Sequence, residues 1–125
     1  MKRLLLLCCL FAATCTYSFA QSAVSKADYT TKVDQLNSLV GANKIDLAKT
    51  QWNLVHDVMK TEFKELKAKY HAAVDAGNEA EKTRIMTAVN AQYKVYYEIM
   101  HLKEDMATNK TVLAQKLNDF GNLIL

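Results

Sequence analysis

The sequence contains no proline, and its only glycines are Gly41, Gly77 and Gly121. Proline and glycine disfavour helix more than any other residues, so this chain has few places where a helix must stop. Nor do apolar and polar residues alternate at a period of two, which is the pattern of a half-buried strand. These absences predict an all-α fold, in which the isolated glycines separate one helix from the next.

The N-terminal segment has the organisation of a secretory signal peptide. The opening Met-Lys-Arg is followed by an apolar run over residues 4–13, which is too short to span a bilayer as a helix. Ser-Phe-Ala at positions 18–20 then matches the small-residue pattern of a cleavage site. We expect residues 1–20 to be cleaved and residues 21–125 to form one helical domain. Its location would be exported: periplasmic, in a bacterial envelope, or secreted.

All three cysteines, Cys8, Cys9 and Cys15, lie inside the expected signal peptide. The mature chain would therefore have no thiol, which excludes a disulfide scaffold, a cysteine nucleophile and a zinc site built on thiolates. Lipidation at Cys15 is an alternative to simple cleavage, although the residues before it lack the usual leucine and small-residue pattern. A small exported domain without disulfides must be held together by packing.

The chain also lacks a strong charge of either sign. It has 16 Lys and Arg against 13 Asp and Glu, and two of the cations belong to the signal segment. A nucleic-acid partner would need a clearly basic face, and no stretch after residue 20 is apolar enough for a transmembrane helix. We therefore expect neither nucleic-acid binding nor a transmembrane span.

Apolar residues after the signal segment recur at spacings of three and four, as they do along amphipathic helices. Asn43 and Asn78 each stand three positions before an acidic residue, so each is predicted to cap the helix that follows it. Thr108 or Asn109 is predicted to cap the last helix. The predicted helices cover about 27–40, 44–76, 79–106 and 109–123.

Helix lengths predict the architecture. The second and third helices would be ~50 Å and ~42 Å long, whereas the first and fourth reach only ~20 to 24 Å. A turn at Gly77 would make an antiparallel hairpin in which facing residue numbers sum to roughly 155. Phe63 then faces Gln92, and Trp52 faces Lys103. We expect a long antiparallel helical hairpin buttressed by two shorter helices, which is an up-down arrangement like a four-helix bundle with a protruding two-helix tip.

The two-helix tip, residues 64–91, is the first candidate site. Two helices alone bury an apolar seam poorly, so such a tip often acquires a partner. Lysines at spacings of four and three run up the same hairpin. They form either a solvated face or a contact for an anionic envelope surface. We expect a protein partner or a second copy of the chain to bind here, through Lys60, Lys64, Leu66, Lys67, Tyr70, Ile85 and Met86.

Two histidines provide the alternative. His56 and His101 would lie almost level on the facing helices, and Glu104 follows His101 by three positions. Imidazoles and carboxylates bind zinc, copper or iron. Bundle di-metal sites, however, use Glu-x-x-His on two helices, whereas this chain has a single His-x-x-Glu. A metal or small-ligand site at His56, His101 and Glu104 is therefore the alternative function.

The sequence offers little for catalysis. Its glycines stand alone, so it has no phosphate-binding loop, and the serines after residue 20 are confined to the N-terminal part. Tyr93, Tyr96, Tyr97 and Met100 share one helical face, which is typical of a core stripe as well as of a cofactor wall; we interpret it as core. We expect no cofactor and no enzymatic activity. The predicted function is that of an exported helical interaction protein, with chaperone-like binding through the tip.

Overall fold

The computed structural model describes residues 24–125, so the expected signal peptide and its cysteines lie outside the described residues. The described chain is all-α, as predicted, and contains no strand within residues 24–125. Its elements are α2 (Lys26–Gly41), α3 (Ile45–Asp75), α4 (Glu79–Leu102), the short 3₁₀-helix η1 (Lys103–Asp105) and α5 (Met106–Leu123). No helix in this part of the chain combines the length and apolar character needed to cross a membrane.

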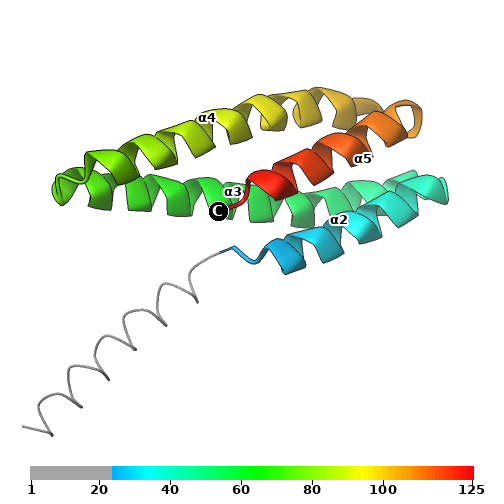
Figure 1. Ribbon diagram of the computed structural model, residues 1–125. Coiled ribbons are helices and arrows are strands. Elements are labelled where there is room, and N and C mark those ends of the chain that lie inside the picture. The colour runs from blue at the N-terminus through cyan, green and yellow to red at the C-terminus, as the bar shows by residue number, and fades with distance from the viewer. Residues whose placement is uncertain (1–23) are drawn as a thin grey trace, which may run out of the picture.

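The helices run up and down one long axis. α3 and α4 form a long hairpin, and the shorter α2 and α5 pack along the half of it that lies away from the hairpin turn (Figure 1). Each α-helix packs mainly on two neighbours, because α2 contacts α3 and α5 while α4 contacts α3 and α5. The result is a four-helix section from which α3 and α4 project as a two-helix tip.

The register of the hairpin agrees with the prediction. Phe63 stacks on Tyr93, one residue from its expected partner Gln92, with ring centroids 4.4 Å apart. Farther from the turn, the Lys103 Nζ lies 5.9 Å from the centre of the Trp52 ring. Both pairs follow from two antiparallel helices of equal rise.

The core of the four-helix section draws on every long helix. Leu36 of α2, Met59 of α3, Ile99 of α4 and Phe120 of α5 are all fully buried in one apolar cluster. Burying such side chains is the main source of stability for a domain without disulfides. The core therefore fixes α3 and α4 in place at the base of the tip.

The turn between α2 and α3 differs from the prediction. Asn43 has a left-handed φ of 59°, and the Lys44 N–H donates to the Leu39 carbonyl at 2.9 Å. This pattern ends α2, so Asn43 is not the N-cap of α3. Asparagine adopts the left-handed region more readily than most residues, which explains why it stands here. Gly41 is simply the last residue of α2.

The turn at the tip matches the prediction. Gly77 has a φ of 66°, and the Asn78 N–H donates to the Ala73 carbonyl at 2.9 Å, which ends α3. The Asn78 side chain accepts the Glu81 N–H at 3.1 Å. Asn78 therefore caps α4 and begins the return arm of the hairpin.

The junction of α4 and α5 lies earlier in the chain than predicted. α4 ends at Leu102, the chain tightens into η1, and Asp105 caps α5 by accepting the Thr108 N–H at 3.2 Å. The predicted cap at Thr108 or Asn109 is therefore wrong. The Asn109 side chain instead donates to the Leu102 carbonyl at 3.1 Å, so it ties the junction back to α4.

A buried polar pair marks the boundary between the four-helix section and the tip. Glu62 of α3 and Gln92 of α4 are almost fully buried. The Gln92 Nε2 donates to the Leu123 carbonyl at 2.8 Å, and the Glu62 Oε2 accepts the Leu125 N–H at 3.3 Å. These bonds satisfy backbone groups at the end of α5, which would otherwise lack partners. α5 ends level with this pair.

Burial raises the pKa of Glu62, and the hydrogen bond from the Leu125 N–H opposes this effect. A carboxylate removed from water loses hydration, so the protonated form is favoured over the charged form in the folded state. The burial of Glu62 could be predicted from the sequence, because Glu62 interrupts the apolar stripe between Met59 and Leu66.

Two glycine substitutions test the turn geometry. Gly77→Ala should lower the free energy of unfolding by about 1 kcal/mol, because alanine is strained at a positive φ. Gly41→Ala is the matched control, since this helical glycine has open space around it and alanine favours helix. Urea unfolding of both variants measures the difference. Equal stabilities would contradict the assigned turn.

Glu62→Gln tests the buried pair. Because the folded pKa of Glu62 is raised, its contribution to stability is fully present below the unfolded value of about 4.3. That contribution is lost as the pH rises through the folded value. Glu62→Gln should therefore be more stable than the wild type at pH 7, and its stability should vary less with pH. The exposed Glu104→Gln is the control, and thermal unfolding across pH is the measurement. A wild-type pH profile in Glu62→Gln would refute the interpretation.

Candidate functional site

Aromatic rings of α3 and α4 line one side of the hairpin. Trp52 stacks on His56 with ring centroids 5.4 Å apart, and His56 stacks on Tyr96 at 5.7 Å. Tyr96 meets Phe63 edge to face at 5.4 Å, and Phe63 stacks on Tyr93. Spacings of three and four residues place these rings on one side of each helix. We call Trp52, His56, Tyr96, Phe63 and Tyr93 the aromatic seam.

The expectation that the tyrosines of α4 form a core stripe is only partly correct. Tyr96 and Met100 are half-buried, but Tyr93 is 39% exposed and Tyr97 is 61% exposed. The fully buried positions of α4 in this part are Gln92 and Ile99. The tyrosines therefore occupy the flank of the inward stripe, where each ring packs on one side and meets water on the other.

His56 is held within the aromatic seam. Its Nε2 lies 2.8 Å from the Tyr96 Oη, a hydrogen bond in which either group can donate. Burial lowers the pKa of His56, the positive charge of Lys60 lowers it further, Asp57 opposes the shift, and Lys103 adds to it. A histidine with a pKa below its ordinary value stays neutral at pH 7. Its packing and hydrogen bond give it a structural role.

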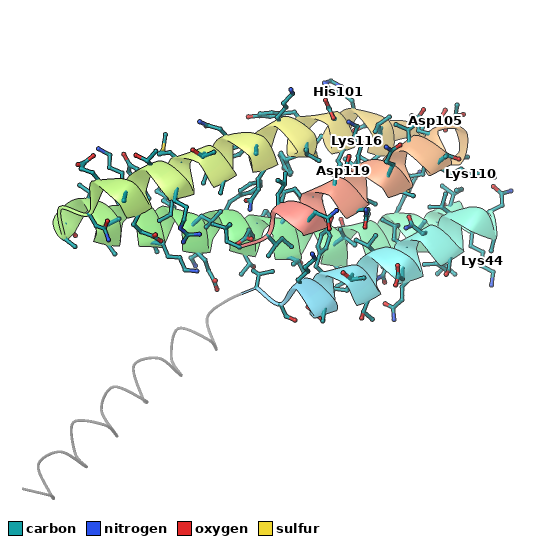
Figure 2. The ribbon with its side chains drawn as sticks, viewed as in Figure 1. Lys44, His101, Asp105, Lys110, Lys116 and Asp119 are labelled. Carbon is teal, nitrogen blue, oxygen red and sulfur yellow. The ribbon has the colours of Figure 1, made fainter. Side chains whose placement is uncertain are left out.

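The structure does not bring His56, His101 and Glu104 together. Figure 2 shows His101 on α4, where its side chain is exposed, and the Glu104 carboxylate lies 3.3 Å from the Lys103 Nζ. Among residues 24–125, no group of three or more His, Cys, Asp or Glu side chains is arranged to hold a metal ion. The prediction rested on the similar height of His56 and His101 along the hairpin, and it did not specify on which face of α4 His101 lies. His101 follows the buried Ile99 by two residues, which is more than half a turn.

A groove lies between α3 and α4 in the tip. It has a volume of about 430 Å³. Both helices contribute side chains, and all but two of these are apolar or aromatic. We call it the tip groove; its lining consists of Phe63, Lys64, Leu66, Lys67, Tyr70, Ile85, Met86, Val89 and Tyr93.

Most of the predicted partner-binding residues line the tip groove, and Lys60 is the exception. Two of them differ from the expectation, because Leu66 and Ile85 are fully buried. The two helices of the tip close over the centre of the seam, so Leu66 and Ile85 form the floor. The accessible apolar surface belongs to the flanks, where Met86 is 43% exposed and Tyr70 is half-buried.

Phe63 and Tyr93 lie outside the predicted tip, residues 64–91, yet both line the tip groove. Their stacked rings form its end nearest the core. Their spacing predicts this position, because Phe63 and Tyr93 lie one helical turn from Leu66 and Val89, on the side of the four-helix section. The aromatic seam therefore runs directly into the tip groove.

The charge of the tip groove is one-sided. Lys64 and Lys67 stand on its α3 wall, whereas no lining residue from α4 is charged. Within the described part of the chain neither lysine forms an ion pair, while the neighbouring Lys60 lies 3.3 Å from Asp57. The arrangement can attract an anionic group to one wall of an apolar trough.

Comparisons with protein-family models, with curated proteins and with solved structures give no match to this chain. A function must therefore be inferred from the aromatic seam and the tip groove.

Proposed function

We propose that this protein is a non-enzymatic, exported interaction protein that binds an apolar segment of a partner protein in the tip groove. The tip groove itself carries the proposal. It offers about 430 Å³ between apolar walls, with two lysines on one side. Continuous apolar surface of this kind on a small domain is typical of an interaction site.

The chemistry of the lining suits partners of variable sequence. Met86 is flexible and polarizable, so it can adapt to different apolar side chains. Tyr70 and Tyr93 supply large contact areas at a low cost in side-chain entropy, and their hydroxyl groups tolerate water. These properties support chaperone-like binding in place of a single fixed ligand.

Two features of the sequence support a location outside the cytoplasm. The N-terminal pattern of a charged start, an apolar run and a small-residue site supports export. The mature chain has no cysteine, so its fold does not depend on the redox state of its surroundings. Such a domain can meet unfolded or membrane-derived segments outside the cytoplasm.

An aggregation assay with matched variants tests the proposal. The client is reduced α-lactalbumin, an acidic protein that aggregates when its disulfides are broken, and light scattering is the measurement. The mature wild type should slow aggregation, and Met86→Asp should remove most of this effect by placing a charge in the apolar trough. Val112→Asp is the control, because Val112 of α5 is 47% exposed against 43% for Met86.

Equal protection by the two variants, or no protection by the wild type, would contradict the proposal. Sedimentation of the wild type and Met86→Asp addresses self-association. A dimer that Met86→Asp dissociates would assign the tip groove to a second copy of the chain. Leu66 is unsuitable for this test, since a charge at a fully buried position would unfold the tip itself.

A further inference from the structure

The walls of the tip groove restrict what can occupy it. Both walls are α-helices, whose backbone N–H and C=O groups are already bonded within α3 and α4. An extended peptide buried here would find no backbone partners, and each unpaired backbone group costs free energy. A helix satisfies its own backbone bonds, so only its side chains need partners.

The dimensions of the tip groove fit two turns of a helix. Its α4 wall runs from Ile85 to Tyr93, a length of roughly 12 Å at the rise of an α-helix. Apolar residues at i, i+3, i+4 and i+7 of a ligand helix span about the same distance. A single alkyl chain is a poorer match than a helix. The groove is open to water at Met86 and Tyr93, so much of such a thin ligand would stay solvated.

The same hairpin already accepts helices in the four-helix section. There α5 packs on α4, and Phe120 meets Phe63 edge to face with ring centroids 5.8 Å apart. α2 and α5 end short of the hairpin turn, so no helix of residues 24–125 continues this packing along the tip (Figure 1). Within the described residues, the tip therefore has two helical walls and no third helix packed between them.

Charge selects among the helices that would fit. The cations Lys64 and Lys67 stand on the α3 wall, and the α4 wall contributes no charged residue to the lining. A ligand helix with acidic residues along one flank of its apolar stripe would pair these lysines. A second copy of the chain is disfavoured, because a symmetric contact would bring its own Lys64 and Lys67 to the same place.

We propose that the tip groove binds an amphipathic helix of a partner protein, with its apolar stripe on the groove floor and an acidic flank against Lys64 and Lys67. This inference rests on the proposed function and specifies the chemistry of the partner.

Three labelled peptides of about four helical turns test the proposal by fluorescence anisotropy with the mature protein. The first is amphipathic, with a leucine stripe flanked on one side by glutamates. The second carries lysine in place of each glutamate. The third has the composition of the first, with its leucines scattered around the helix. Only the first should bind tightly to the wild type, and its affinity should fall as salt is added.

A charge-reversed variant, Lys64→Glu with Lys67→Glu, makes the test specific. It should bind the acidic peptide about tenfold more weakly, because two ion pairs become repulsions. The same variant should bind the lysine peptide better than the wild type does, which also shows that it is folded. The matched control is Lys44→Glu with Lys110→Glu, at the end of the bundle opposite the tip (Figure 2). It should behave like the wild type.

Several outcomes would overturn this inference. The scattered-leucine peptide could bind as tightly as the first peptide, or charge reversal at Lys64 and Lys67 could leave binding unchanged. The protein could also dimerise through the tip groove and so exclude the peptide. If the acidic peptide does not bind while Met86→Asp still abolishes client protection, the proposed function stands and only the helical, acidic partner is refuted. If the acidic peptide does not bind and Met86→Asp does not reduce client protection, both proposals are refuted.

Discussion

Helices of unequal length cannot cover one another, and this mismatch governs the molecule. α3 has 31 residues and α4 has 24, whereas α2 has 16 and α5 has 18. A complete apolar core forms only where all four helices overlap. Beyond that section no other helix of residues 24–125 packs along α3 and α4, so these two bury the centre of their shared seam but not its flanks. The tip groove is the direct consequence, because a two-helix contact leaves apolar side chains partly in water.

A buried polar pair lies at the boundary between the four-helix section and the tip. Glu62 and Gln92 interrupt the apolar stripes of α3 and α4 at the level where α5 ends, and they bind backbone groups of Leu123 and Leu125. Burial of a carboxylate is unfavourable, as the raised pKa of Glu62 shows. The bonds to the end of α5 offset part of that cost.

The aromatic seam joins the stable half of the molecule to the open half. Its rings pack against one another from Trp52 to Tyr93, so the end of the tip groove nearest the core is lined by packed aromatic rings. The far end carries the flexible Met86, and the cations Lys64 and Lys67 stand along the α3 wall, starting beside Phe63. An aromatic end, an adaptable end and a charged α3 wall are compatible with a site that requires an apolar stripe and tolerates variation beside it.

The sequence by itself determined the helices, the turn at Gly77 and the register of the hairpin, because apolar spacing, a left-handed glycine and equal helical rise are local properties. It also placed most of the groove residues in one region. Tertiary structure alone decided which of them are exposed, burying Leu66 and Ile85 while leaving Met86 and Tyr93 at the surface. It likewise separated His101 from His56, and Asn43 lies in the turn after α2 and does not cap α3. The physical reason is that helical periodicity specifies the face on which a residue lies, whereas its burial depends on which neighbouring helix covers that face.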